Sequence, residues 1–401
     1  MDPSTPTNAP THRGIRSRRG LGLRLVALLL ALLLGAVAVA CTDDPSDDVV
    51  VDTGEPTDGG APAADCEPED LPDPIEVADV EASDIDGATV TLAAHDSFAV
   101  SDGLFEDFTA DTGITVEVLT SGDAGSLVSQ AILSAGNPVA DVLFGIDTTF
   151  LCRGTSAGIF VPYTAPGLDS VPDEYHLDPQ DLVTPIDVGD VCLNYSVDAF
   201  ADGEAPSTLD DVSGLAESFV TSSPESSSPG FAFLLATISA YGEDGWEDYW
   251  AGLREGGLEV VSSWEDAYYG PFDAGSGDRT IVTSYASSPV ADVVYSDPPR
   301  DEPAIGVVAD SCFRQVEFAG ILRGTDVPEA AAKVIDFMLS SAFQEDIPLN
   351  MFVEPVSSDA QLPEIFEQHR TIIERPLTLS PAEIEAGREA WLDRWTEIVL
   401  R

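Results

Sequence analysis

The chain has 401 residues and a formal net charge of −55 at pH 7, because 72 acidic residues stand against 17 lysines and arginines. A surface this negative repels phosphate backbones and anionic lipid headgroups, so the composition excludes a nucleic-acid-binding role. The four histidines are scattered along the chain and the cysteine spacings match no zinc motif, which argues against a metal cluster.

The N-terminus has the pattern of an export signal. Five arginines lie before or at the start of an apolar run that continues to Cys41. A basic region, a short apolar region and a small-residue tail predict a signal peptide over residues 1–40. Residues 38–41, with the sequence AVAC, resemble a bacterial lipobox, so Cys41 is the predicted lipid attachment site. The adjacent arginines at 18 and 19 also fit a twin-arginine signal, and both export routes stay open.

The next stretch, residues 41–86, is acidic and rich in proline and glycine, which predicts a disordered tether. The folded part begins near residue 87 and is long enough for two domains. Beyond Cys41, an even number of cysteines in an exported protein permits two disulfides with three connectivities. These possible disulfide cysteines are Cys66, Cys152, Cys192 and Cys312, of which the last two lie in strand-like runs and are candidate neighbours.

Strands and helices alternate between residues 88 and 147. Strands are predicted at 88–96, 114–123 and 140–147, and helices at 101–113 and 124–136. This alternation predicts a parallel sheet with helices on both faces, whose ligands bind beyond the carboxyl ends of the strands. Those ends carry His95, Asp96 and Ser97, then Asp123 and Ala124, then Asp147.

The second half of the chain repeats this mixture. A strand-rich run covers 182–196, and a strand that becomes a helix near Ser287 covers 280–296. A strand is predicted at 313–322 and one long helix at 328–348. Two further helices are predicted at 231–242 and 244–255, and the last helix begins at Ser380, with Pro381 at its first position and Glu383 completing a capping box.

Four of the five tryptophans occur in pairs spaced by four residues. This helical spacing predicts packing for Trp246 with Trp250 and for Trp391 with Trp395. Trp264 stands alone in the polar stretch SSWEDAYYG, on a loop or a short strand end. It is therefore the tryptophan that we assign to a binding site.

Several segments together resemble a known family. The runs HDSFAVSDG, GDAGSLVSQAILSAGNPVADVLFGID, SSWEDAYYG, TSYASSP, FRQVEFAG and IDFMLSSAFQEDIPLNMFVEPV occur in the order found in thiamine-binding proteins. These are the extracytoplasmic receptors of bacterial thiamine ABC importers, and the resemblance covers about residues 88–401. It implies an α/β, two-lobe periplasmic-binding-protein-like fold of type II, with the ligand in the interlobe cleft. We expect lobe 1 at 87–188 plus 300–355, and lobe 2 at 189–299 plus 356–401.

The resemblance also implies site residues. Aligned with the family pattern, the predicted thiamine-binding positions are Asp123, Ala124, Ser227, Ser228, Trp264, Ser284, Tyr285, Ala286, Ser287 and Phe352, with His95 where the family has tyrosine. Thiamine joins a permanently charged thiazolium to a flat aminopyrimidine, and an aromatic face attracts such a cation. A buried cation needs an opposing charge, which Asp96 or Asp123 would supply.

The resemblance implies a transport role rather than chemistry. We expect thiamine or its phosphate esters as the ligand, an ABC permease as the membrane partner, a monomeric receptor, and neither cofactor nor metal. The location would be the outer face of the cytoplasmic membrane, as a lipoprotein, or the periplasm. The lobes would close around the ligand by a hinge at the crossovers.

Two other classes of protein are weighed against this one. A ferric-ion receptor of the same fold would use adjacent tyrosines, which Tyr268 and Tyr269 fit superficially, and another small ligand also stays open. We regard these two tyrosines as packing or marginal neighbours of Trp264. An exported enzyme is disfavoured because the sequence has no H-E-x-x-H and no phosphate-binding Gly-Lys loop.

Overall fold

The computed structural model describes residues 66–77, 85–201 and 203–401. The predicted signal peptide, Cys41 and most of the predicted tether lie outside these residues. The described strands form one ten-stranded mixed sheet. They are β1 (Thr89–Ala94), β2 (Thr115–Thr120), β3 (Val142–Asp147), β4 (Phe160–Val161), β5 (Thr184–Ser196), β6 (Phe219–Ser222), β7 (Glu259–Val261), β8 (Ile281–Tyr285), β9 (Ile305–Leu322) and β10 (Glu354–Pro355).

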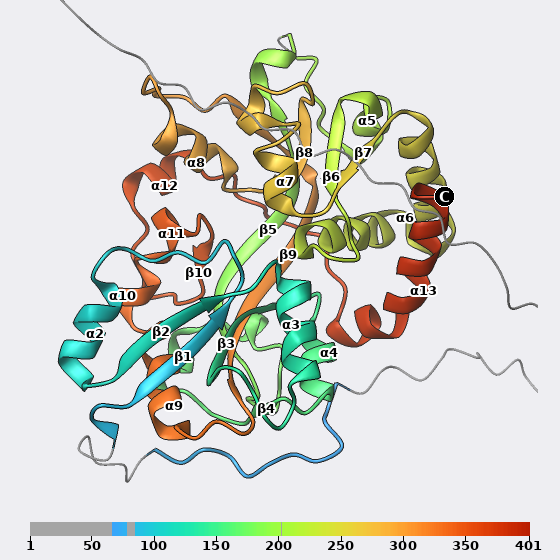
Figure 1. The fold of residues 1–401 in the computed structure, drawn as a ribbon. Coiled ribbons are helices and arrows are strands. Elements are labelled where there is room, and N and C mark those ends of the chain that lie inside the picture. The colour runs from blue at the N-terminus through green and yellow to red at the C-terminus, as the bar shows by residue number, and fades with distance from the viewer. Residues whose placement is uncertain (1–65, 78–84, 202) are drawn as a thin grey trace, which may run out of the picture. The chain divides into compact units, whose positions relative to one another are not determined.

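Two long strands join the halves of this sheet. The strand order is β2-β1-β3-β9-β5-β8-β6-β7, with β4 on β9 and β10 on β5. The early part of β5 and the late part of β9 pair in the half that contains β1 to β3, and their other ends continue into the half with β6 to β8 (Figure 1). Strands β1 to β3 are parallel, as predicted, whereas β9 joins them antiparallel. The predicted two-lobe α/β fold is confirmed; the residue bounds predicted for the lobes stay a prediction.

Helices cover the sheet in both lobes (Figure 1). The α-helices among the described residues are α2 (Leu104–Thr112), α3 (Ala124–Leu133), α4 (Leu151–Ser156), α5 (Leu209–Ser213), α6 (Ser228–Glu255), α7 (Trp264–Tyr268), α8 (Ser288–Tyr295), α9 (Pro328–Met338), α10 (Ser341–Gln344), α11 (Ile347–Asn350), α12 (Glu364–His369) and α13 (Pro381–Val399). Short 3-10 turns occur at Pro166–Ser170, Asp173–Tyr175, Val197–Ala199, Ala216–Ser218 and Asp273–Gly275.

The alternation of side chains along β1 explains the layers of lobe 1. Val90 and Leu92 are buried in the core formed with α2 and α9, whereas Ala93 belongs to the core on the opposite face, with α3 and α4. Successive residues of a strand point to opposite faces, so one apolar strand supplies both cores. Because β1, β2 and β3 are parallel, their carboxyl ends lie at one edge of the lobe, where the predicted site residues begin.

In lobe 2 the paired tryptophans form the core, as predicted. Trp250 on α6 and Trp395 on α13 are fully buried and meet at a centroid distance of 5.6 Å in a near-perpendicular arrangement. Trp246 is also buried, and Trp391 packs partly buried against the same cluster. Edge-to-face contacts of this kind stabilise a core beyond their buried area.

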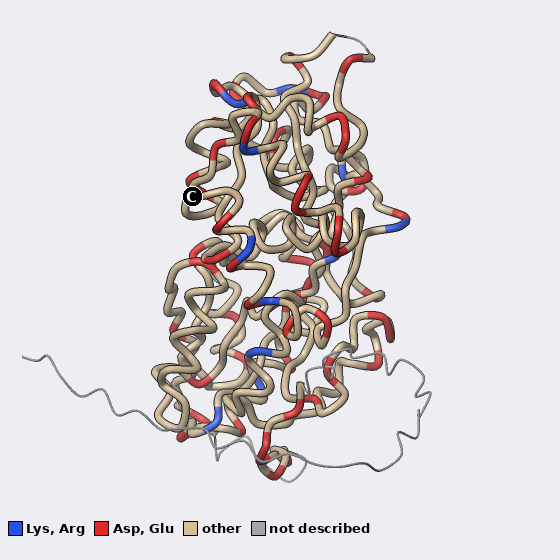
Figure 2. The backbone as a smooth tube through the Cα atoms, turned by 90° about the vertical axis from the view of Figure 1, so that its right-hand side faces the viewer, with Lys and Arg blue, Asp and Glu red and all other residues tan. Residues whose placement is uncertain are grey.

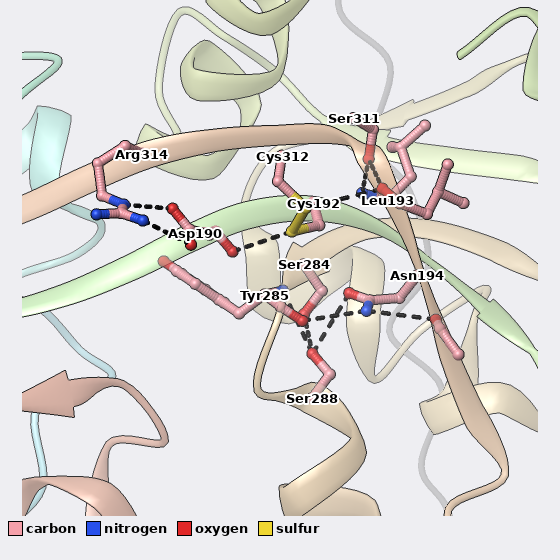
Figure 3. Close-up of a disulfide and its surroundings, with 12 residues drawn as sticks. Asp190, Cys192, Leu193, Asn194, Ser284, Tyr285, Ser288, Ser311, Cys312 and Arg314 are labelled. Carbon is pink, nitrogen blue, oxygen red and sulfur yellow. Dashed lines mark hydrogen bonds and ion pairs between the residues drawn. A yellow bond between two sulfur atoms is a disulfide. The ribbon is translucent and has the colours of Figure 1, made fainter. Parts of the chain in front are cut away.

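The middle of the crossover is held by an ion pair and a disulfide (Figure 3). Asp190 on β5 and Arg314 on β9 are register partners, and the guanidinium donates two hydrogen bonds to the carboxylate, at 2.6 and 3.2 Å. Beside them, the Cys192–Cys312 disulfide joins the same two strands where their register shifts. The two strands that link the lobes are thus fastened to each other at their crossing.

Two helix predictions were wrong in detail. The segment predicted as one helix over 328–348 is three helices, α9 to α11. Ser340 begins a new helix because its hydroxyl accepts from the backbone N–H of Phe343, which offers the backbone an alternative to continuing α9. The helices predicted at 231–242 and 244–255 form one element, α6, with a kink at Gly242, whose φ of 69° suits glycine. The capping box of Ser380 and Glu383 is present.

The remaining cysteines pair near the start of the described chain. Cys66 forms a disulfide with Cys152 on α4, and the Thr155 hydroxyl donates to the Cys66 carbonyl at 2.8 Å. Acidic residues are spread along the described chain, with few basic residues between them (Figure 2). None of the helices in the described residues is long and apolar enough to cross a membrane.

Candidate functional site

A cleft of about 320 Å³ opens beyond the carboxyl ends of β1 and β2, where both lobes contribute side chains. Its lining is mainly aromatic, acidic and hydroxyl-bearing. It consists of His95, Asp96, Ser97, Gly122, Asp123, Ala124, Ser228, Pro229, Ser263, Trp264, Glu265, Tyr268, Tyr269, Tyr285, Ser287, Ser288, Ala291, Tyr295, Gln315, Glu317, Asn350, Met351, Phe352 and Val353.

Trp264 forms an aromatic wall of this cleft. It is the first residue of α7, not a loop or strand-end residue, because Ser263 caps the helix by accepting from the backbone N–H of Asp266. Its indole N–H donates to the Ser284 hydroxyl at 3.0 Å, and its ring stacks on Tyr268 at a centroid distance of 5.2 Å. These contacts fix the orientation of the indole before any ligand arrives.

Further rings stand next to Trp264. The ring of Tyr285, at the end of β8, lies 6.1 Å from the indole at an angle of 70°. It fits because position 189 on β5 is glycine: a Cβ there would lie 3.1 Å from the Tyr285 ring. Phe352 meets Tyr295 at 5.4 Å, and its carbonyl accepts a hydrogen bond from Ser287. Phe352 has a φ of 55°, a conformation uncommon for a bulky residue and concentrated at functional sites.

The lobe 1 edge of the cleft supplies carboxylates. Asp96 accepts from the backbone N–H of Gly122 at 2.9 Å. Asp123 caps α3 by accepting from the N–H of Ala124 at 2.8 Å, and it also interacts with the Ser227 hydroxyl and the backbone N–H of Ser228 at the start of α6. Burial raises the pKa of Asp123, although these hydrogen bonds oppose the rise. The N-terminus of α6 is therefore already matched with a carboxyl group of the protein itself.

Behind these residues lies a group of buried ionisable side chains. Burial raises the pKa of Asp147 to about 6, against hydrogen bonds from Ser228 and Thr149. Burial lowers the pKa of His95, but the carboxylate of Glu317, 3.5 Å from Nε2, outweighs this and raises the pKa overall. Gly145 allows this placement, because a Cβ there would lie 2.4 Å from the imidazole.

No lysine or arginine lines the cleft among the described residues. In the same part of the chain, no group of three or more His, Cys, Asp or Glu side chains is arranged to hold a metal ion. The cleft thus offers aromatic faces, hydroxyls and negative charge, a combination suited to a flat organic cation.

The structure brings most of the predicted site residues together. Those that line the cleft are Asp96, Asp123, Ala124, Ser228, Trp264, Tyr285, Ser287 and Phe352, together with His95. Ser227 is fully buried as the cap of α6, and Ser284 stands behind Trp264 as its hydrogen-bond partner. Ala286 is buried against the Cys192–Cys312 disulfide and lines a second cavity, of about 760 Å³. Whether these residues contact a ligand stays a prediction.

Sequence reasoning missed several residues of the cleft. Tyr268 and Tyr269 were expected to be packing or marginal neighbours of Trp264. Tyr268 is buried and packs on the indole as expected, but its ring and that of Tyr269, which is 63% exposed, also line the cleft. Gln315 and Glu317, on β9, were not singled out at all. The available signal was polar and ionisable side chains inside an otherwise apolar strand, FRQVEFAG.

Comparison with known proteins agrees with this geometry. Residues 137–372 match the family of bacterial extracellular solute-binding proteins, and the chain belongs to that family. The chain is 28% identical to the thiamine-binding periplasmic protein of Escherichia coli, over 78% of this chain and 94% of that protein. A solved periplasmic thiamin binding protein has a TM-score of 0.69 at 27% identity, covering 78% of this chain and 96% of that one.

A second solved structure is related by fold alone. Iron-bound HitA from Pseudomonas aeruginosa has a TM-score of 0.65 at 20% identity and covers 78% of this chain and 99% of that one. The fold is therefore shared by receptors for different solutes, and the ligand must be argued from the cleft. Membership of the family confirms the prediction of an exported solute-binding protein rather than an enzyme.

Proposed function

We propose that the protein captures thiamine in the cleft beside Trp264. The observation that carries this proposal is a fixed indole face, with Tyr285 beside it, in a cleft lined by carboxylates and by no lysine or arginine of the described chain. A cation over an indole gains about 0.5–2 kcal/mol, most where water is excluded. The similarity to thiamine-binding periplasmic proteins supports the same ligand.

Transport requires more than the cleft. In this proposal the lobes close around thiamine by bending at the crossing of β5 and β9, and the closed receptor delivers its ligand to an ABC permease. The receptor acts as a monomer without a cofactor, and a lipid on Cys41 holds it at the membrane. Small-angle scattering profiles that are identical with and without thiamine would contradict closure.

Calorimetric titration tests the ligand directly. Thiamine, its monophosphate and ferric citrate are titrated into the same preparation of the protein. We expect saturable heat with thiamine, and recovery of unchanged thiamine after denaturation. No heat with thiamine would refute the proposal.

The ferric-ion alternative rests on the adjacent tyrosines. Tyr268 and Tyr269 both line the cleft, but burial raises the pKa of Tyr268, which disfavours the tyrosinate that would bind iron. A visible tyrosinate-to-iron absorption band on adding ferric salt would favour iron over thiamine.

A further inference from the structure

Three acidic residues stand in a row across the sheet at the inner end of the cleft. Asp147 on β3 is the register partner of Glu317 on β9, and Glu317 is in turn the partner of Asp187 on β5. Directly paired residues on neighbouring strands point to the same face, with Cβ atoms about 4.5–5.5 Å apart. The backbone register therefore places three carboxyl groups side by side.

This acidic row is buried. Asp147 and Asp187 have no exposed surface, and Glu317 is 8% exposed. Asp147 is satisfied by hydroxyl donors, because Ser228 and Thr149 both donate to it. Neither carboxyl oxygen of Asp187 accepts a hydrogen bond from any described donor, although both are buried. The group that Asp187 meets is the carboxyl of Glu317.

Two adjacent carboxyl groups can hydrogen-bond only if one of them carries a proton. Like charges directly opposite each other in a sheet are destabilising, and an unpaired buried carboxylate is costlier still. Burial and the neighbouring carboxylates raise the pKa of Asp187 well above its usual range, which agrees with the geometry. A neutral Asp187 carboxyl is therefore the form that this arrangement favours.

The acidic row is open to the cleft on the Glu317 side. Glu317 and Gln315 both line the cleft. The amide nitrogen of Gln315 donates to Glu317 at 3.4 Å, while its Oε1 is buried without a hydrogen-bond partner in a side chain only 2% exposed. An unpartnered acceptor beside buried carboxyls marks a place for a ligand that brings positive charge and hydrogen-bond donors.

The other charged groups around the acidic row neutralise it only in part. Those that face it are His95 after β1, Asp123 at the start of α3, Tyr285 on β8 and Arg388 on α13. The imidazole of His95 lies 3.5 Å from Glu317 and pairs with that one carboxylate. The Arg388 guanidinium is engaged elsewhere: it donates to the Thr149 carbonyl and lies against the rings of Phe150 and Phe231. His95 is the one described basic side chain that lines the cleft, so further positive charge must come from the ligand.

We propose that the row Asp147, Glu317 and Asp187 is the cation subsite of the cleft, and that it releases a proton to solvent when a permanently charged organic cation binds. The inference rests on thiamine binding as proposed above. The protonated carboxyl becomes a carboxylate, its proton passes to the buffer, and the cation replaces the lost positive charge. The ligand class is a flat organic cation with N–H donors and no acidic group near this end.

Calorimetry in buffers of different ionisation enthalpy measures the proton directly. Thiamine is titrated into wild-type protein at pH 7 in phosphate and in Tris, and the slope of observed heat against buffer enthalpy counts the protons released. We expect a release approaching one proton, and an affinity that rises with pH by up to about tenfold per unit. Asp187→Asn, which keeps the shape but cannot release a proton, should abolish the buffer dependence.

Two further variants complete the test. Glu317→Gln should also abolish proton release, because it removes the neighbouring carboxylate whose negative charge keeps Asp187 protonated. Asp178→Asn is the matched control: burial raises the pKa of this carboxyl too, but it lies outside the cleft, so release should be unchanged. Infrared spectra of ligand-free protein should show the carbonyl stretch of a protonated carboxyl at pH 7, which thiamine removes and Asp187→Asn lacks.

The possible failures are distinct. Thiamine heat without buffer dependence would overturn the proton exchange and leave thiamine binding intact. Absence of the infrared band in ligand-free wild type would overturn it whatever thiamine does. Absence of any thiamine heat would overturn the proposed function and, with it, this assignment of the acidic row.

Discussion

Replacing Trp264 by alanine tests the aromatic wall most directly. The indole is held by Ser284 and Tyr268 before binding, so little side-chain ordering opposes its contact with a ligand. Losing a desolvated cation–π contact costs about 0.5–2 kcal/mol, and losing an aromatic stack costs about 0.5–1.5 kcal/mol more. Together these costs are about 1–3.5 kcal/mol, so we expect Trp264→Ala to weaken thiamine binding about fivefold to three-hundredfold, with about 1.4 kcal/mol for each factor of ten.

Matched variants separate the ring from its hydrogen bond. Trp264→Phe keeps an aromatic face but loses the N–H donated to Ser284, so it should fall between wild type and Trp264→Ala. Trp391→Phe, on α13 outside the cleft, should titrate as wild type does. All are compared by calorimetry, with thermal unfolding to check folding. A folded Trp264→Ala protein with wild-type affinity would refute the assignment of Trp264 to the site.

Three further outcomes are expected. Thiamine diphosphate should bind more weakly than thiamine by calorimetry, since no described lysine or arginine lines the cleft and Asp123 already occupies the start of α6; equal affinities would contradict this. Removing the Cys192–Cys312 disulfide, with a sequence separation of 120, should lower the free energy of unfolding in urea by about 2–4 kcal/mol, and an unchanged midpoint would count against it. The pKa of Asp147 is raised in the folded protein to about 6, so its contribution to the free energy of unfolding is lost as the pH rises from about 4 to 6. This loss amounts to about 3 kcal/mol, and Asp147→Asn should not show it. The measurement is the free energy of unfolding of wild type and variant at several pH values across that window, and equal pH dependence in both would contradict the prediction.

Much of the fold could be predicted because local patterns carry it. Alternating strands and helices located β1 to β3, and the capping box at Ser380 located the start of α13. The helix predicted over 328–348 was wrong because the hydrophobic pattern continues past Ser340, while a single side-chain hydrogen bond there begins a new helix. A competition between two local hydrogen-bonding options is not visible in hydrophobic periodicity.

Part of the candidate site could also be predicted from local sequence, and part of it could not. Asp96 and Asp123 were found because strand ends are where such sheets bind ligands. The acidic row could not be predicted in this way. Asp187 and Glu317 lie 130 positions apart inside strands, and they become neighbours only through the register of β5 and β9. Tyr268 likewise lines the cleft only because α7 turns its ring beneath Trp264.

The Cys66–Cys152 disulfide determines where in lobe 1 a pull on the chain ahead of it would arrive. Cys152 lies on α4, whose apolar side chains pack in the lobe 1 core, so tension arriving at Cys66 is passed covalently into lobe 1. Lobe 2 receives such a force through β5 and β9, through the contact of α13 with α4, and through the hydrogen bond from Ser228 on α6 to Asp147. In a receptor that is anchored through its N-terminal side, lobe 1 would therefore stay fixed relative to the anchor, and lobe 2 would move when the lobes close.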